Sequence, residues 1–195
     1  QVEADVRQLV RIGTDQISLS ADLSYVIKRA GVFSLRLAVP ASYRVDRVVG
    51  TNIAQWVEKD ASGTSATRVV EVTLKEKIMG AYQLHVELAQ TLDTLPRSFG
   101  VTGIVPLEVQ KLSGYVAVSG EEGLQIKSES FDGLTEVPAA LVPAAGSARA
   151  LPATGVLAFK LIPGEAAAHA GWKLAVATER IDSWVRAEVM NTLTL

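Results

Sequence analysis

The sequence predicts an all-β protein, an antiparallel β-sandwich of one or two units with little helix. Two observations lead to this prediction. Apolar and polar residues alternate along most of the first half of the chain, which is the period of a strand with one buried face. Glycines stand at the ends of the alternating runs, where tight turns require positive backbone angles. Because hydrophobic residues make up 48% of the chain and aromatic residues 6%, we expect a core of Val, Leu, Ile and Ala.

The alternation is clearest over residues 17–27, and it resumes over residues 33–39 until Pro40. Between these runs, Arg29-Ala30-Gly31 predicts a tight turn, so the two runs predict a hairpin. Further strands are predicted at residues 44–49, 53–58, 68–74 and 82–88, with turns at Gly50, residues 60–63 and Met79-Gly80. This spacing, without helical crossovers, is typical of an immunoglobulin-like sandwich.

The stretch from residue 91 to residue 103 lacks a sustained period and contains Pro96, Gly100 and Gly103, which predicts a long connection between two β units. Residues 1–92 would form the first sandwich unit and residues 93–103 the connection. Residues 104–195 would form a second β unit, either separate or packed with the first as one domain. Its strands are predicted at residues 104–110, 114–119, 124–130, 156–162, 172–180 and 185–195, with short helical turns at 139–142 and 165–169.

Nine apolar side chains share the inward parity of their predicted strands, and we expect all of them to be buried. They are Leu19, Leu23, Phe33, Leu35, Leu37, Leu84, Val86, Leu174 and Val176.

The two ends of the chain predict a segment of a longer protein. The chain starts at Gln1 rather than at a methionine and ends on strand-like residues. Residues 185–189 match residues 2–6 in apolar pattern and acid placement. Either the end of the chain begins a second copy of the module in a tandem array, or two amphipathic strands look alike over five residues.

Charge and composition exclude several classes of partner. The 19 basic and 21 acidic residues leave no net field that would concentrate phosphate backbones, so nucleic acid is not an expected partner. No run of 18 apolar residues occurs, so no membrane span is predicted within the segment. Cysteine is absent, which excludes disulfides and thiolate metal sites.

No catalytic constellation, cofactor site or metal site is predicted. His85 shares an outward, polar face with Gln83 and Glu87, and His169 lies in an alanine-rich loop, so neither a metal site nor a Ser-His-Asp arrangement follows. Glu121-Glu122 is interpreted as a solvated turn. Because carboxylate spacing is not readable from sequence, a glycan-active enzyme stays open as a third reading.

The aromatic side chains indicate one possible binding function. β-Sandwich modules that hold polysaccharides stack exposed aromatic rings on sugar rings. Trp56, Trp184 and Tyr115 are the candidate carbohydrate-binding residues, and Trp56 is expected to share a face with Ala54 and Glu58. Trp172 shares its face with apolar strand residues and is assigned to the core.

Four segments carry a resemblance to a known group of proteins: Ala30-Gly31-Val32-Phe33, the acid-flanked Trp56, residues 75–82 and residues 112–118. Together they resemble β-sandwich modules of large, uncharacterised bacterial cell-envelope proteins. The resemblance implies a periplasmic or cell-surface location and a tandem β architecture. It implies no activity.

The sequence therefore predicts a non-catalytic structural or interaction module of a larger exported or cell-envelope protein. Its expected partners are other domains of the parent chain or another envelope protein. The alternative is a carbohydrate-binding module, with a polysaccharide as the partner.

Overall fold

The computed structural model describes residues 1–59, 66–143, 155–162 and 172–181. Within them, the protein is an all-β sandwich with a nine-stranded and a three-stranded sheet, and its single helical element is a 3₁₀ turn, η1 (Ala139–Leu141). The predicted fold class is confirmed. The strands are β1 (Val2–Ile12), β2 (Gln16–Pro40), β3 (Arg44–Gly50), β4 (Ile53–Lys59), β5 (Thr67–Thr91), β6 (Ser98–Val101), β7 (Val105–Pro106), β8 (Lys111–Gly120), β9 (Leu124–Asp132), β10 (Leu134–Glu136), β11 (Val156–Leu161) and β12 (Lys173–Arg180).

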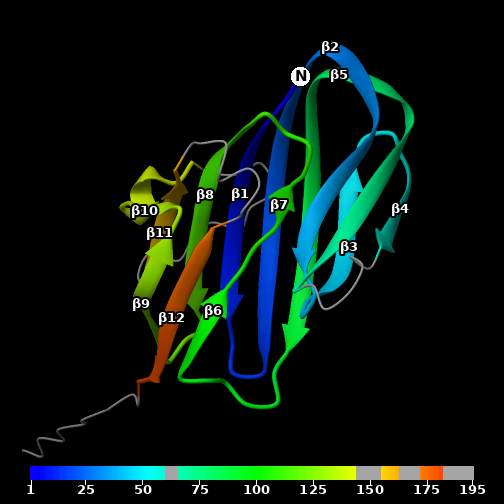
Figure 1. Ribbon diagram of the computed structural model, residues 1–195. Coiled ribbons are helices and arrows are strands. Elements are labelled where there is room, and N and C mark those ends of the chain that lie inside the picture. The colour runs from blue at the N-terminus through cyan, green and yellow to red at the C-terminus, as the bar shows by residue number, and fades with distance from the viewer. Residues whose placement is uncertain (60–65, 144–154, 163–171, 182–195) are drawn as a thin grey trace, which may run out of the picture.

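The larger sheet joins strands from both halves of the chain. Its order is β10-β11-β8-β1-β2-β5-β3, with β4 also paired to β5 and β7 to β2. Strands β1 and β8 run parallel, from the pair Glu3 and Lys111 to the pair Ile12 and Gly120, while the other pairs are antiparallel. The smaller sheet, β6-β12-β9, lies in front of β1 and β8 in Figure 1.

Strands β2 and β5 are each 25 residues long and arch together at the top of the molecule (Figure 1). Residues 16–27 pair with residues 80–91, and residues 34–40 pair with residues 67–73. The predicted hairpin turns at Arg29-Ala30-Gly31 and at Met79-Gly80 are therefore wrong. They are facing bends in two continuing strands, since each half of β2 pairs with β5 rather than with the other half.

The core lies between the layers and confirms eight of the nine expected buried residues: Leu19, Leu23, Leu35, Leu37, Leu84, Val86, Leu174 and Val176. Phe33 is the exception, with 58% of its surface exposed. The register between β2 and β5 shifts between Val32 and Ser34. A bulge of this kind adds a residue and changes which side chains face inward, so Val32 packs against the core and Phe33 faces solvent.

The second half of the chain follows the predicted strands with three differences. Strand β6 lies inside the predicted connection, because it pairs with β12 from Ser98 to Val101 rather than forming through its own alternation. Only β7 forms within the predicted strand at 104–110, and β10 was not predicted. The helical turn expected near 139–142 is confirmed by η1. The predicted turns at 60–63 and 165–169 and the predicted strand at 185–195 lie outside the described residues.

A buried amide fastens the segment between β6 and β7 to strand β1. Gln8 Nε2 donates to the carbonyl oxygen of Ile104 at 2.9 Å, and Gln8 Oε1 accepts from the Ile104 amide at 2.8 Å. Gly103 makes this approach possible, because a Cβ there would lie 2.3 Å from Gln8 Oε1 and 2.4 Å from the Trp172 ring. The smaller sheet is thereby held in place over the larger one.

Candidate functional site

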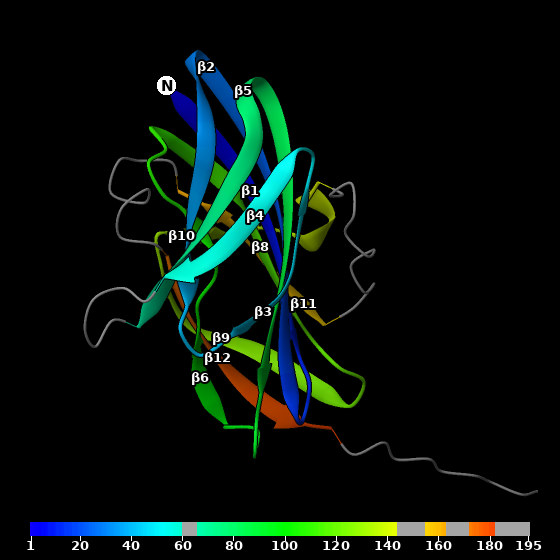
Figure 2. The same ribbon diagram turned by 90° about the vertical axis from the view of Figure 1, so that its right-hand side faces the viewer.

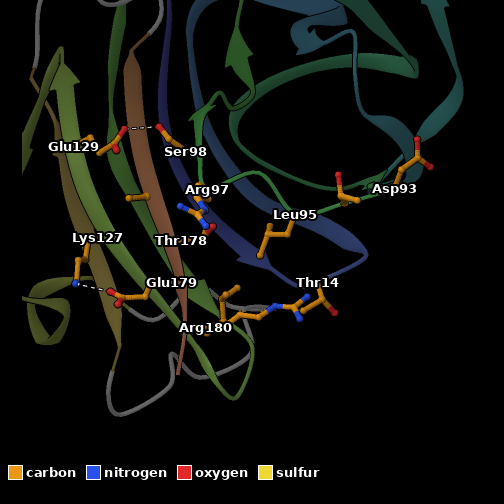
Figure 3. Close-up of a pocket in the computed structure, with 13 residues that line it drawn as sticks. Thr14, Asp93, Leu95, Arg97, Ser98, Lys127, Glu129, Thr178, Glu179 and Arg180 are labelled. Atoms are coloured by element: carbon orange, nitrogen blue, oxygen red, sulfur yellow. Dashed lines mark hydrogen bonds and ion pairs between the residues drawn. The ribbon is translucent and has the colours of Figure 1, made fainter. Parts of the chain in front are cut away.

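An open groove of about 930 Å³ lies at one end of the three-stranded sheet (Figure 3). Four segments that are distant in sequence form it: the turn between β1 and β2, the connection between β5 and β6, and the ends of β9 and β12. Its lining consists of Thr14, Asp93, Thr94, Leu95, Arg97, Ser98, Leu124, Lys127, Glu129, Ala177, Thr178, Glu179 and Arg180.

The walls of the groove are fixed by contacts between neighbouring segments. Lys127 Nζ of β9 lies 2.8 Å from Glu179 Oε2 of β12. The Ser98 hydroxyl donates to Glu129, and the Thr178 hydroxyl donates to the carbonyl oxygen of Pro96 at 2.6 Å. Because these contacts tie the connection to the sheet, the groove has a defined shape before any ligand arrives.

Charges of both signs face the groove, but they are not equally engaged. The hydrogen bond from Lys127 holds the pKa of the Glu179 carboxyl below its ordinary value, so this carboxyl stays ionised rather than serving as a proton donor near neutral pH. Within the part of the chain that the structure describes, neither Arg97 nor Arg180 forms an ion pair. In Figure 3 the Arg180 side chain extends toward Thr14. The groove thus presents two guanidinium groups, which bind carboxylate and carbonyl oxygens in a planar fork.

A second hollow, of about 490 Å³, lies on the outer face of the larger sheet around His85. His85 Nδ1 lies 2.8 Å from Asp22 Oδ1, its partner across β2 and β5, and His85 Nε2 lies 3.2 Å from Glu87 Oε1. Nearby, Asp5 accepts a hydrogen bond from Ser113 at 2.8 Å. His85 has the outward, polar position that the alternation predicts, and both of its ring nitrogens are engaged by carboxylates.

Other chemical features of the described residues are as follows. Among the described residues, no three His, Asp or Glu side chains are grouped so that they could hold a metal ion. No helix in the described ranges is long and apolar enough to cross a membrane. Glu121 and Glu122 are exposed, and Glu121 Oε1 accepts a hydrogen bond from the Thr14 amide at 3.1 Å. His169 lies outside the described residues.

Of the candidate carbohydrate-binding residues, the two that the structure describes, Trp56 and Tyr115, are not brought together. Trp56 lies in β4 and packs against the core with Ile53, because the register of β4 shifts between Ile53 and Gln55. The prediction that Trp56 shares a face with Ala54 is therefore wrong. Tyr115 is half-buried in β8 opposite Arg7 of β1, and β1, β2 and β5 separate it from β4. Trp184 lies outside the described residues, and Trp172 is in the core with 6% exposed.

The residues that line the groove were not identified from the sequence. Lys127, Glu129 and Glu179 carried one weak signal, since they occupy outward positions of predicted strands. Arg97 and Arg180 carried none, because only the fold brings the connection and the end of β12 to the same place.

The chain was compared with protein-family models, with curated proteins and with solved structures. No family model matches the chain, and no curated protein matches it. Among solved structures, an M1 zinc metallopeptidase from Deinococcus radiodurans is similar, with a TM-score of 0.51 and 14% identity over 90% of this chain and 42% of the peptidase. Leukotriene A4 hydrolase from Saccharomyces cerevisiae has a TM-score of 0.52 and 9% identity over 91% of this chain and 29% of the enzyme. The yeast enzyme in complex with bestatin has a TM-score of 0.51 and 12% identity over 94% and 30%.

These likenesses show a shared fold alone, because the identities are low. The chain spans less than half the length of the enzymes that it matches. The fold and the groove together define an all-β sandwich whose arrangement of strands also occurs as one part of longer proteins.

Proposed function

We propose that this chain is a non-catalytic structural or interaction module of a larger exported or cell-envelope protein. Its groove receives an extended segment from another domain of that protein or from another envelope protein. The observation that carries the proposal is the pair of guanidinium groups, Arg97 and Arg180, that face an open groove without an ion-pair partner among the described residues.

The groove suits a polypeptide segment in its chemistry. Backbone carbonyls and acidic side chains accept hydrogen bonds from guanidinium groups, and arginine is enriched in protein interfaces for this reason. Leu95 and Leu124 add apolar contact, while Thr14 and Thr178 add hydroxyl groups. Since the wall contacts already hold the groove in shape, little order has to be gained on binding, which favours affinity.

The solved structures support the part of the proposal that concerns a larger protein. In the peptidase and hydrolase chains, the matching region is 29% to 42% of the length. This β arrangement can therefore form one domain of a multidomain protein. A domain in that setting needs a surface that contacts its neighbours.

Site-specific photo-crosslinking in the full-length parent protein tests this function. A photoreactive residue replacing Arg97 should form crosslinks to another domain or to a partner protein. The same residue replacing Lys160, which is exposed on β11, is the matched control and should form few. Equal crosslinking from the two positions would contradict the groove as the docking site.

The likeness to solved peptidases favours a second candidate, in which the chain is the β domain of a longer peptidase-like enzyme. The Deinococcus radiodurans enzyme was solved with a Tyr-Ser-Ala substrate, and this tripeptide is a suitable probe. The full-length parent should hydrolyse it in a chelator-sensitive manner, while the isolated chain should not. A parent protein without such activity would remove this candidate and leave the interaction module unaffected.

The carbohydrate-binding alternative makes a separate demand on Trp56, Trp184 and Tyr115. A sugar platform requires an exposed ring face, and Trp56 packs against the core, so Tyr115 is the better placed of the two described residues. A glycan array tests the alternative: wild-type binding to one polysaccharide that is lost in Tyr115→Ala, with unchanged stability, would replace the interaction module by a sugar binder.

A further inference from the structure

The arch of β2 and β5 carries large apolar side chains in contact with solvent. Phe33 is 58% exposed and Met79 is 68% exposed. They stand next to Val32 and Ile78, which are partners across the two strands and pack against the core. Since successive side chains of a strand point to opposite faces, Phe33 and Met79 both project outward from the arch.

Basic residues lie close to this apolar pair along both strands. The bends of the two strands carry four cations, and two carboxylates are near: Lys28, Arg29, Lys75 and Lys77, with Glu3 and Glu76. Lys28 forms an ion pair with Glu3 at 2.7 Å. Arg29, Lys75 and Lys77 form none within the described part of the chain. Within the bends themselves, residues 28–33 and 75–80, four cations less the one carboxylate of Glu76 give a local charge of +3, although the whole chain has a formal charge of −2.

The shape of the arch limits what covers it. Figures 1 and 2 both place the arch at one extremity of the molecule. It is therefore a protruding feature that can contact a surface, and not a pocket that encloses a ligand. Phe33 and Met79 together offer at most about 400 Å² of side chain, whereas a stable protein partner covers about 800 Å² on each side of an interface. A bilayer surface does not need a preformed interface of about 800 Å², because the lipids adapt their packing to the apolar side chains that insert among them.

We infer that the arch is a membrane-contact site for a bilayer that contains anionic lipid. Phe33 and Met79 enter the boundary between headgroups and acyl chains, where apolar side chains leave water. Arg29, Lys75 and Lys77 meet the negatively charged headgroups, which attract cations placed close to the surface. This role is independent of the groove, which is lined by the turn between β1 and β2 and by the end of β12, away from the arch (Figure 1).

Sedimentation with vesicles tests the inference. The purified chain should bind vesicles of phosphatidylcholine with 30% phosphatidylglycerol and should not bind phosphatidylcholine alone. The double variant Phe33→Ser/Met79→Ser should bind at least tenfold more weakly, because it loses the apolar contact. Lys75→Gln/Lys77→Gln should weaken binding about 25-fold, at about fivefold for each cation. Raised salt should also weaken binding of the wild-type chain to anionic vesicles, because it screens the charges.

Matched controls separate the arch from general surface effects. Leu141 is 62% exposed on η1, so Leu141→Ser should bind as the wild type does, and so should Lys160→Gln/Lys173→Gln. A Phe33→Trp variant should add a tryptophan emission signal that shifts to the blue with anionic vesicles, which reports entry of this position.

Three results would overturn the inference. The first is absence of binding to anionic vesicles, and the second is equal binding to neutral ones, since the cations would then play no part. The third is a dimer in sedimentation velocity that Phe33→Ser/Met79→Ser dissociates while vesicles do not compete, because the arch would then contact a second copy of the chain.

Discussion

The buried side chain of Gln8 takes the place of a strand partner for Ile104, bonding both its amide and its carbonyl. Gln8→Leu fills similar space and leaves both backbone groups buried without partners. We expect a loss of about 2 to 5 kcal/mol in the free energy of unfolding, measured by urea denaturation. Gln55→Leu, at an exposed position of β4, is the control and should change it by less than about 0.5 kcal/mol. Equal effects of the two variants would show that the amide contact is not formed.

Gly114 is required where β8 runs beside β1. Its φ is +152°, and a Cβ there would lie 1.9 Å from the carbonyl oxygen of Val6. Gly114→Ala must therefore separate the two strands, and we expect a loss of about 3 kcal/mol or more in the free energy of unfolding. Gly100→Ala provides the comparison, because nothing lies within 4 Å of the Cβ position there. A mild effect of Gly114→Ala, similar to that of Gly100→Ala, would contradict the parallel pairing.

At the scale of strands, bulges decide which side chains of β2 face inward. Leu35 is 5% exposed, while Phe33, two residues earlier, faces solvent. Leu35→Ala should cost about 2 to 5 kcal/mol in equilibrium denaturation, because it leaves a cavity in the core. Phe33→Ala should cost less than about 1 kcal/mol. The opposite ranking would mean that uninterrupted alternation describes β2 correctly and that the register shift is absent.

These bulges mark how far the sequence determines the strands. Alternation correctly predicted β3, β4, β8, β9, β11 and β12 and eight of the nine core residues, because a half-buried strand needs that pattern. It placed Phe33 and Trp56 on the wrong faces, since a bulge changes the parity without leaving a signal in the local pattern. Strand β6 was missed for a related reason, because its pairing with β12 comes from a remote segment.

At the scale of the whole molecule, the groove was not predictable for a topological reason. Arg97 and Arg180 lie 83 positions apart in the sequence and meet only because β12 pairs with both β6 and β9. The parallel pairing of β1 with β8 is of the same kind. Periodicity specifies that a strand forms and which residues it buries, whereas the choice of its neighbours depends on contacts between distant segments.

The buried tyrosines predict how the fold responds to alkaline pH. Burial raises the pKa of Tyr43 to about 12 from its ordinary value of 10.0, and burial also raises the pKa of Tyr25. Because the folded pKa is the higher one, the stabilisation is complete below about pH 10 and is lost as the pH rises toward 12. The free energy of unfolding should therefore decline between pH 10 and 12, and less steeply in Tyr43→Phe. Identical slopes for the two proteins would contradict burial of the Tyr43 hydroxyl.

Hydrogen exchange tests the docking of a segment in the groove most directly. Within residues 93–97, the amides of Asp93, Thr94, Leu95 and Arg97 donate no backbone hydrogen bond to another described residue, so they should exchange rapidly in the isolated chain. In the full-length protein, or in complex with the partner, we predict that their exchange slows by at least tenfold, while the exposed turn at residues 51–52 exchanges at the same rate in both. Equal exchange of residues 93–97 in the isolated chain and in the full-length protein would contradict the groove as an interaction site.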